Sequence, residues 1–336
     1  MKSKMHKILA AALVATLAFP LGACADGNGP DELGTVHVYM PDGAPAVALS
    51  AMMDAGYANT EFTVVTAAVI GGVVSNKTAD MAIMPINAAA TLFNKDHSIT
   101  MLSVNTHGNM YLLGKTEETV SPAELSGKVV GSIGEGQVPD LTLKMMLDEC
   151  DVEFGKGDAA TAGQATIRYP GPSEALPALL KQGAIDYAFM PEPAVSTAIE
   201  KFGFHIVMNA QEQWTELFGG DYPQACLVAQ NSLVRNHPEY IDGFLAALKR
   251  TETDKWAENN PEKAVDAVKA HFVDDTGSNL STLTRESIAR CNFATVDATD
   301  AYDTCNKYFA KLVAMKNELG TAVLAAAPTD EFYYKK

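Results

Sequence analysis

Short apolar segments alternate with helix-forming segments along most of this chain, and this alternation restricts the fold more than any other feature. The segments with the length and residue types of strands are residues 36–40, 61–66, 81–84, 100–104, 111–113, 128–132, 167–169, 188–190, 205–208 and 226–229. Good helix formers, such as residues 87–93, lie between them. Repeated strand–helix alternation is typical of an α/β fold with a largely parallel sheet.

The chain is long enough for two such units, because it has 336 residues and a domain takes about 150. Beyond residue 229 the pattern becomes helical. Pro238 and Pro261 stand at predicted first helical positions, and Asn260 is a predicted N-cap. Residues 262–272 form a predicted helix whose apolar side chains share one face. We therefore expect two α/β units and a helical C-terminal third.

The charge of the chain excludes two classes of partner. It has 41 acidic and 25 basic residues, which gives a formal net charge of −16. Binding to a phosphate backbone needs clustered Lys and Arg, so nucleic acid is not an expected partner. An anionic membrane surface is disfavoured for the same reason.

The first 23 residues have the pattern of a secretory signal. Lys2, Lys4 and Lys7 precede an apolar stretch at residues 8–21. This stretch is shorter than the roughly 20 apolar residues that a spanning helix needs, and it matches the apolar region of a signal peptide. We expect residues 1–23 to be removed on export.

The signal is followed by a cysteine in a distinctive setting. Residues 21–24, Leu-Gly-Ala-Cys, resemble the lipobox of bacterial lipoproteins, where the cysteine is lipidated and becomes the new N-terminus. We expect lipid on Cys24 and a flexible tether over residues 24–34, which are small, polar and rich in turn formers. The alternative is an ordinary signal peptide with a chance cysteine.

Cysteine usage agrees with export. Apart from Cys24, the chain has Cys150, Cys226, Cys291 and Cys305, an even number for an oxidising compartment. Cys291 and Cys305 are close in sequence and form the predicted disulfide. Four buried thiols are an equally weighted alternative. No C-x-x-C motif indicates a zinc or redox site.

The motifs of common enzymes are absent from the sequence. Gly108 and residues 114–116 resemble a P-loop, but five residues separate the glycines where the motif requires four. The glycines of residues 131–136 are in the wrong order for a dinucleotide fingerprint, and neither G-x-S-x-G nor H-E-x-x-H occurs. We predict no catalytic residues, no metal and no cofactor.

Several segments, taken in order, resemble the NMT1/THI5-like group of substrate-binding proteins of ABC importers, which bind sulfonates, nitrate or thiamine-pyrimidine precursors. The segments that carry the resemblance are residues 40–45, 79–90, 183–193, 236–241 and 259–262. The resemblance implies a bilobal type II periplasmic-binding fold with a two-strand hinge. The implied lobes are residues 35–112 with 228–336, and residues 113–227.

The candidate binding residues come from loops that follow the predicted strands. In open parallel sheets a ligand lies beyond the carboxyl ends of the strands, and helix N-termini offer free N–H groups there. The candidates, with one nearby tryptophan, are Asp42, Gly43, Ala44, Gly71, Asn87, Asn105, His107, Glu135, Gln137, Tyr169, Glu192 and Trp214.

Five of these candidates have an open alternative. Asp42 either pairs with a cationic ligand group or braces its turn, and Asn87 either binds ligand or caps its helix. His107 either stacks on the ligand or lies on the rim. Glu192 either faces the ligand or makes structural hydrogen bonds, and Trp214 is either a core residue or an aromatic platform.

We therefore expect a non-catalytic, monomeric solute-binding lipoprotein, anchored outside the cytoplasm through lipid alone, that delivers a small molecule to an ABC permease. Its lobes are expected to close over the ligand by hinge motion. The alternatives are a THI5-like pyrimidine-forming enzyme on the same scaffold and a lipoprotein sensor or adhesion module without a transport role.

The expected ligand is neutral, zwitterionic or partly cationic rather than a sulfonate or nitrate. The proposed loops carry Asp42, Glu135 and Glu192, with Asp140 nearby, whereas Arg168 is the arginine closest to them in sequence. Helix N-termini bind anions unaided, which leaves an anionic ligand open as the alternative. A flat heterocycle would stack on the candidate aromatic platforms, which are Tyr169, His107 and Trp214.

Overall fold

The computed structural model describes residues 32–171, 175–273, 280, 283–316 and 320–336. The predicted signal peptide at residues 1–23 and the lipidation site Cys24 lie outside the described residues, as does most of the predicted tether at 24–34. Residues Leu33–Lys336 form one compact unit. Among the described residues, none of the helices combines the length and apolar character needed to cross a membrane.

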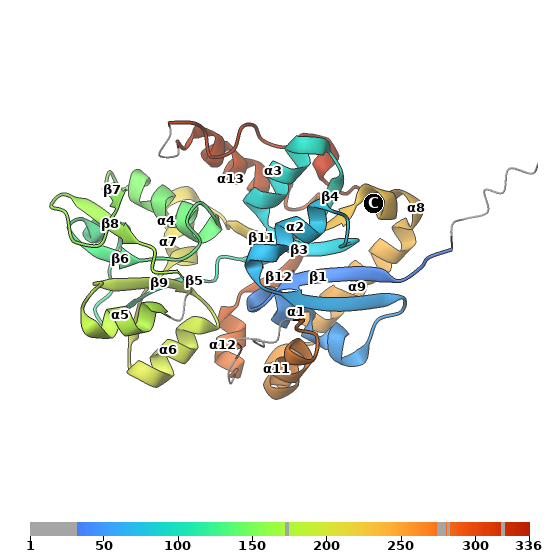
Figure 1. The fold of residues 1–336 in the computed structure, drawn as a ribbon, viewed down its shortest axis with the longest axis horizontal. Helices are drawn as coiled ribbons and strands as arrows, with labels where there is room; N and C mark the ends of the chain where they lie inside the picture. Colours follow the sequence, from blue (N-terminus) through green and yellow to red (C-terminus); the bar gives the residue numbers. More distant parts are fainter. Residues whose placement is uncertain (1–31, 172–174, 274–279, 281–282, 317–319) are drawn as a thin grey trace, which may run out of the picture. The chain divides into compact units, whose positions relative to one another are not determined.

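The first sheet has six strands in the order β12-β4-β11-β3-β1-β2. Strand β1 pairs in parallel with β2 and β3, whereas β11 runs antiparallel to β3 and β4, and β12 antiparallel to β4. The sheet is therefore mixed, with a parallel half, as Figure 1 shows. Its strands are β1 (Val36–Pro41), β2 (Thr60–Val65), β3 (Met81–Pro85), β4 (Ile99–His107), β11 (Pro223–Gln230) and β12 (Phe293–Asp297).

The second sheet repeats this plan with the order β10-β5-β9-β6-β8-β7. Strands β6, β7, β8 and β9 are joined in parallel, and β5 runs antiparallel to both β9 and β10. Its strands are β5 (Met110–Gly114), β6 (Val129–Gly131), β7 (Glu153–Lys156), β8 (Gln164–Arg168), β9 (Tyr187–Pro191) and β10 (His205–Asn209).

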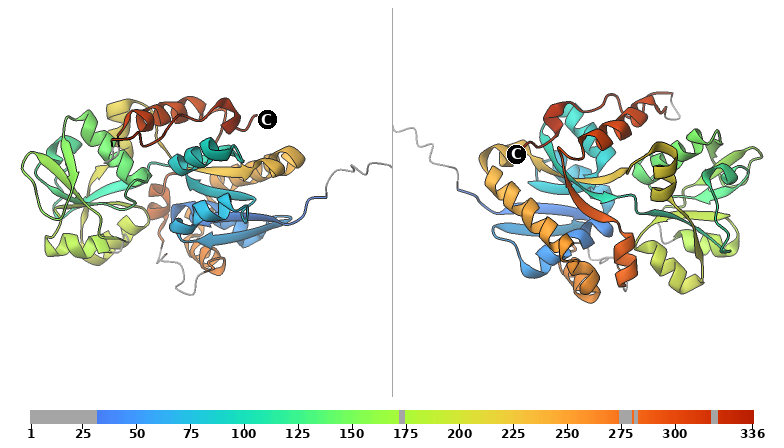
Figure 2. Two further views of the ribbon diagram at one scale, coloured as in Figure 1. Left: turned by 45° about the horizontal axis from the view of Figure 1, so that its top comes forward. Right: turned by 180° about the vertical axis from the view of Figure 1, so that it is seen from behind.

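Helices surround both sheets (Figure 2). Helix α1 packs against α9, α10 and α11, and α3 packs against β3, β4 and β11. The helices of the described residues are α1 (Ala44–Ala55), α2 (Ile70–Ser75), α3 (Ile86–Asp96), α4 (Val138–Glu149), α5 (Leu176–Gln182), α6 (Ala194–Phe202), α7 (Ala210–Phe218), α8 (Asn231–Asn236), α9 (Pro238–Thr253), α10 (Trp256–Asn259), α11 (Pro261–Ala270), α12 (Arg285–Arg290) and α13 (Tyr302–Ala314).

The predicted C-terminal helices are confirmed. Helices α9 and α11 begin at Pro238 and Pro261, as the proline rule predicts. Asn260 is the N-cap of α11, but its amide donates to the Trp256 carbonyl (2.8 Å) and makes no capping bond. The buried face of α11 includes the predicted residues Ala264, Val265 and Val268.

The crossings between the sheets lie a few residues from the predicted positions. Because β5 pairs with β9 and β10, Met110–Gly114 belongs entirely to the second sheet, and the first crossing is at Gly108 and Asn109. The return crossing is at residues 219–222, since β11 begins at Pro223. The predicted boundaries at 112/113 and 227/228 are therefore corrected. We call residues 33–107 and 223–336 the first lobe and residues 110–218 the second lobe.

The cysteines differ from the predicted pairing. Cys150, Cys226, Cys291 and Cys305 are free thiols, so the predicted Cys291–Cys305 disulfide is not formed. The Cys291 thiol lies directly after α12 and donates to the Ser287 carbonyl (3.3 Å). Cys305 lies in α13, on the other side of β12 in the chain, where burial raises its pKa to about 12. Closeness in sequence does not bring the two thiols together, because β12 separates their helices.

Candidate functional site

Three helix N-termini border the region where the lobes meet. Strands β1 and β3 of the first lobe lead into α1 and α3, and strand β6 of the second lobe leads into α4. Their N-cap residues are Gly43, Pro85 and Gln137, and none makes a side-chain capping bond. The second residue of α1 and of α4 is proline (Pro45 and Pro139), which has no N–H, and the Ala46 N–H donates to the Gly43 carbonyl (3.1 Å), so few N–H groups of α1 and α4 remain available to an acceptor.

The loop before α1 is braced from within. The Asp42 carboxylate accepts a hydrogen bond from the Gly43 N–H (3.0 Å), and the Gly43 carbonyl accepts from the Val47 N–H (3.0 Å). Gly43 has φ 99°, a left-handed conformation that favours glycine. Ala44 is the buried first residue of the helix. Asp42 thus has the turn-bracing role, which was one of its two predicted alternatives.

Asn87 makes a hydrogen bond between the lobes. It is the second residue of α3, whose N-cap is Pro85, so the predicted capping role is wrong. Its Nδ2 donates to the Gly136 carbonyl in the loop before α4 (3.3 Å). Its Oδ1 is buried and has no hydrogen-bond partner among the described residues. An acceptor of this kind, beside the N-termini of α3 and α4, can receive a donor from a ligand.

Two acidic residues of the second lobe, Asp140 and Glu135, have cationic partners within that lobe. Asp140 is fully buried, and its Oδ2 accepts from the Gly136 N–H (2.8 Å) and the Lys144 ammonium (2.9 Å). Its Oδ1 accepts from the Tyr169 hydroxyl. Glu135 pairs with Lys156 (2.7 Å), and the ammonium of Lys156 also lies 5.6 Å from the centre of the Tyr169 ring. These carboxylates therefore carry little unbalanced charge.

A buried ion pair forms the second polar connection between the lobes. Glu192, whose side chain is fully buried, accepts from Arg290 Nε (2.6 Å) and from the Ser196 hydroxyl (2.8 Å) and N–H (3.0 Å). Arg290 Nη2 also donates to the Ser196 hydroxyl (2.7 Å), and the Arg290 carbonyl accepts from the Tyr111 hydroxyl (3.0 Å). Glu192 thus has its predicted structural hydrogen bonds.

Sequence reasoning missed Arg290. Arg168, the arginine nearest the candidate loops in sequence, pairs instead with Asp158 (2.9 Å). Arg290 ends α12 in the first lobe, 98 residues along the chain from Glu192. No local pattern links two residues so far apart, and only the tertiary fold brings them together.

Two predicted residues, Asn105 and Trp214, are buried in the core. Asn105 is not in a loop: it is fully buried within β4, where its Nδ2 donates to Thr295 Oγ1 (3.0 Å). Trp214 is 3% exposed and packs on Tyr222 and Tyr308, with ring centroids at 5.2 and 5.7 Å. It is a core residue near the crossings rather than a ligand platform.

His107 joins the two crossings. It ends β4, and its Nδ1 lies 2.5 Å from Asp221 Oδ2 in the return crossing, while its Nε2 donates to the Ala294 carbonyl (3.0 Å). Burial lowers the pKa of His107, but the hydrogen bond and charge of Asp221 outweigh it, so the pKa is raised. His107 therefore belongs to the hinge, not to the ligand surface or its rim.

Of the remaining predicted residues, Gly71 has no side chain, and the backbone of Gln137 is already bonded, because its N–H donates to the Gly134 carbonyl (2.7 Å) and its carbonyl accepts from the Leu141 N–H (2.9 Å). Gly71 is the second residue of α2, and nothing lies within 4 Å of the position a side chain would take. Gln137 is the exposed N-cap of α4.

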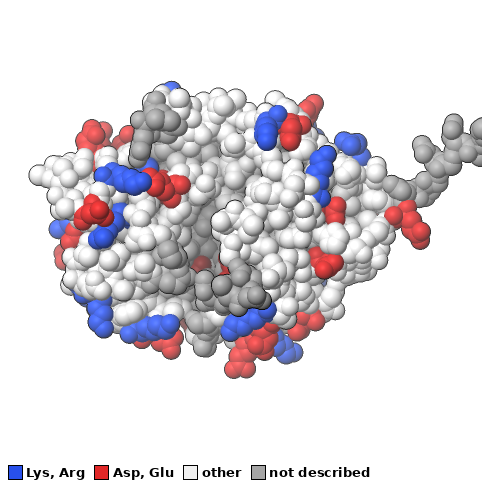
Figure 3. Space-filling view, viewed as in Figure 1, with Lys and Arg blue, Asp and Glu red and all other residues white. Residues whose placement is uncertain are grey.

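Figure 3 shows the hollow between the lobes, and the charged side chains visible there lie mostly at the outer edge of this face. No group of three or more His, Cys, Asp or Glu side chains within the described ranges could hold a metal ion.

Comparisons with known proteins agree with this architecture. Residues 48–273, more than half of the chain, match the NMT1-like family. An ABC transporter structure from Parabacteroides distasonis is 19% identical, with TM-score 0.70, covering 90% of this chain and 99% of that chain. The ligand-binding component of an ABC-type import system from Staphylococcus aureus, with zinc bound, is 14% identical, with TM-score 0.60, covering 89% and 98%.

The periplasmic aliphatic sulphonate-binding protein SsuA from Escherichia coli is 13% identical, with TM-score 0.60, covering 88% of this chain and 97% of that chain. No curated protein sequence matches the chain. At these identities the solved structures establish the fold, and they confirm the predicted bilobal periplasmic-binding architecture.

Proposed function

The chain belongs to the NMT1-like family, and from this membership we propose that it is the solute-binding component of an ABC importer. In this role it is a non-catalytic, exported protein that binds a small molecule between its lobes and presents it to a permease. The similar solved structures support the role, because two of them are described as ligand-binding or sulphonate-binding proteins of such systems.

The observation that carries the proposal is the contact between the lobes at the helix N-termini. Asn87 at the start of α3 reaches the carbonyl of Gly136 in the loop before α4. This hydrogen bond joins the lobes at the starts of α3 and α4, and the buried Asn87 oxygen there has no partner among the described residues. Such a surface gains hydrogen bonds when a polar ligand lies between the lobes.

Hinge closure follows from the same connections. The lobes are joined by the short crossings at Gly108–Asn109 and residues 219–222, where a small backbone rotation moves one lobe against the other. The Glu192–Arg290 pair and the Asn87–Gly136 bond form only when the lobes are together. A ligand that adds bonds across the groove therefore favours the closed form.

We propose a neutral or zwitterionic ligand. Glu135, Asp140 and Glu192 already have cationic partners, so they do not call for a cationic ligand. The positive ends of the helix dipoles at these N-termini suit the carboxylate of a zwitterion. An aromatic ligand is less favoured, because Trp214 and His107 are buried and Tyr169 is the remaining candidate platform.

Anchoring is a separate proposal that depends on Cys24. A lipidated Cys24 would hold the protein at the membrane through several acyl chains, since one chain binds only marginally. The Cys24→Ala variant is expected to leave the membrane fraction, as judged by immunoblotting of fractionated cells. Unchanged membrane association of this variant would contradict the lipoprotein assignment.

The decisive experiment is native mass spectrometry of freshly purified protein, which identifies a co-purifying molecule. That molecule at 100 times its Kd should raise the free energy of unfolding by about 2.7 kcal/mol, and small-angle scattering should show compaction. A thermal-shift panel then compares neutral heterocycles and zwitterions with alkanesulfonates and nitrate. A response to the anions alone would overturn the ligand proposal, and turnover of the bound molecule would overturn the non-catalytic role.

A further inference from the structure

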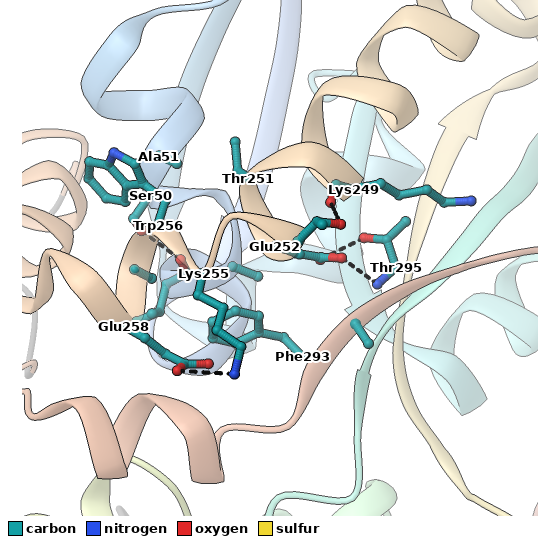
Figure 4. Close-up of a pocket in the computed structure, with 15 residues that line it drawn as sticks. Ser50, Ala51, Lys249, Thr251, Glu252, Lys255, Trp256, Glu258, Phe293 and Thr295 are labelled. Atoms are coloured by element: carbon teal, nitrogen blue, oxygen red, sulfur yellow. Dashed lines mark hydrogen bonds and ion pairs between the residues drawn. The ribbon is translucent and has the colours of Figure 1, made fainter.

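A second cavity lies wholly within the first lobe. It has a volume of about 450 Å³, within the range of small-molecule sites. Its walls come from α1, the end of α9, α10 and β12, and every lining residue belongs to the first lobe. The charged and aromatic residues that line the cavity are shown in Figure 4 and are Lys249, Glu252, Lys255, Trp256, Glu258 and Phe293.

Glu252 is a fixed acceptor on the wall of this cavity. Its Oε2 accepts from the Thr295 N–H and its Oε1 from the Thr295 hydroxyl, both at 2.7 Å. Thr295 is held in turn by Asn105 Nδ2 (3.0 Å), deep in the first sheet. The carboxylate is therefore oriented before any ligand arrives, which lowers the entropic cost of binding. Each carboxylate oxygen still has capacity for a further hydrogen bond.

Among the described residues, Glu252 forms no direct ion pair, although the charges of His107 and Lys249 act on it from further away and offset part of the rise in its pKa that burial causes. Lys249 turns away to Asp297 (2.7 Å), and Lys255 lies 3.6 Å from Glu258. Within the part of the chain that the structure describes, no Lys or Arg nitrogen lies within 4.0 Å of the Glu252 carboxylate. By contrast, Glu258 on the same cavity has two cationic neighbours, because Arg285 also lies 3.6 Å from it.

The lining of the cavity is partly aromatic. Trp256 and Phe293 both line it, and both are half-buried. An indole or phenyl face attracts a cation and packs on apolar groups. From these features we propose that this cavity binds a small organic ammonium cation, with its ammonium group on Glu252 and its apolar portion against Trp256 and Phe293.

The proposal implies a direction for the pH dependence. Burial raises the pKa of Glu252, and an ammonium ligand binds its ionised form. Affinity should therefore fall as pH decreases through the pKa of Glu252. The other charged groups facing this region are Lys249 on α9, Lys255 and Glu258 at α10, Arg285 on α12, and His107 on β4, which lies against Asp221.

The test uses 2-phenylethylammonium as the probe and 2-phenylethanol as its uncharged counterpart. The chain has two tryptophans, so the indole N–H signal of Trp256 in an NMR spectrum is assigned by its persistence in the Trp214→Phe variant. The ammonium probe should shift the Trp256 signal in a saturable way, and 2-phenylethanol should bind at least tenfold more weakly. Glu252→Gln should weaken binding of the ammonium at least tenfold.

The matched control is Glu258→Gln, which removes a cavity carboxylate that already has cationic neighbours. It should change the affinity for 2-phenylethylammonium less than threefold. Equal binding of the two probes, unchanged affinity in Glu252→Gln, or no shift of the Trp256 signal at millimolar ammonium would each overturn the proposal. Glu252 also holds Thr295, so Glu252→Gln could change the structure as well as the charge. The pH dependence of ammonium binding to the unmodified protein gives an independent check. Affinity that does not fall towards acidic pH would also contradict the proposal.

Discussion

The lobes meet in two regions of different chemistry, the hinge side and the groove side. On the hinge side, α13 of the first lobe packs on the second lobe through apolar and aromatic groups. The Tyr308 ring lies 5.7 Å from that of Trp214 and 6.5 Å from that of Tyr222 in the return crossing. The Lys311 ammonium lies 3.7 Å from the centre of the Phe218 ring. The rings of Trp214, Tyr222 and Tyr308 are almost fully buried, so this region is closely packed.

The groove side is held by few, polar contacts. Among the described residues, its cross-lobe bonds include the Asn87–Gly136 hydrogen bond, the bonds of Arg290 to Glu192 and Ser196, and the bond from the Tyr111 hydroxyl to the Arg290 carbonyl. Water can replace such bonds when the lobes separate, whereas exposing the aromatic rings of the hinge side would lose buried apolar area. The difference indicates which side opens: the groove side separates while the hinge side stays packed.

The strongest test of this comparison removes the centre of the hinge side. Trp214→Ala deletes a ring that is 3% exposed and should lower the free energy of unfolding by about 3–5 kcal/mol, measured by urea denaturation. The control is Trp256→Ala, because that ring is only half-buried and should cost clearly less. Equal losses in the two variants would show that the hinge side is not the firm contact.

The next test breaks the ion pair of the groove side. Arg290→Ala leaves the Glu192 carboxylate buried without its cation, and because the Arg290 side chain is 35% exposed we expect a loss of about 2–3 kcal/mol. Arg168→Ala is the control, since its partner Asp158 is 86% exposed and the pair should contribute little. Scattering should show a larger open population for Arg290→Ala alone. A loss no larger than that of the control would contradict a closing role for this pair.

Much of the fold could be predicted because its signals are local. The apolar strands alternate with helices, and the proline-started helices α9 and α11 lie where the sequence places them. The predicted position of the first crossing was wrong because the apolar residues of β5 would suit a strand of either sheet. Only the pairing of β5 with β9 and β10 assigns them to the second lobe.

The site could be predicted only as a set of loops. Loop position identified Asn87 as a candidate residue, but it did not predict its bond to Gly136. The predicted loop at residues 105–107 is part of β4, so the buried Asn105 serves the sheet. Arg290 was missed because its partner Glu192 is distant in sequence. Contacts between distant segments depend on packing, which no short motif encodes.

On the hinge side, a smaller effect on stability depends on pH. Both ring nitrogens of His107 face acceptors, Asp221 and the Ala294 carbonyl, so the charged form is favoured and its pKa is raised above the ordinary value near 6.5. Its contribution is therefore complete below about pH 6.5 and is lost as pH rises through the folded-state pKa. His107→Gln should cost about 1–2 kcal/mol at pH 5.5 and less at pH 8.5, measured by urea denaturation. A cost that is the same at both pH values would contradict the ion pair.

The smallest effect is expected from Asn87, and it separates stability from closure. Its bond to Gly136 is long, at 3.3 Å, and joins neutral groups, so Asn87→Ala should lower the free energy of unfolding by only about 0.5–1 kcal/mol. The same change removes an unpartnered buried oxygen, which offsets part of that loss. Affinity for the co-purifying ligand should nevertheless fall at least tenfold, because Asn87 stands where the lobes meet at two helix N-termini. Thr78→Ala, an exposed change on the first lobe, is the control for general effects and should leave affinity unchanged. If the affinity of Asn87→Ala for the ligand were unchanged, the ligand would bind elsewhere and not on the groove side. The groove side would then contribute only to closure, through Arg290 and Glu192.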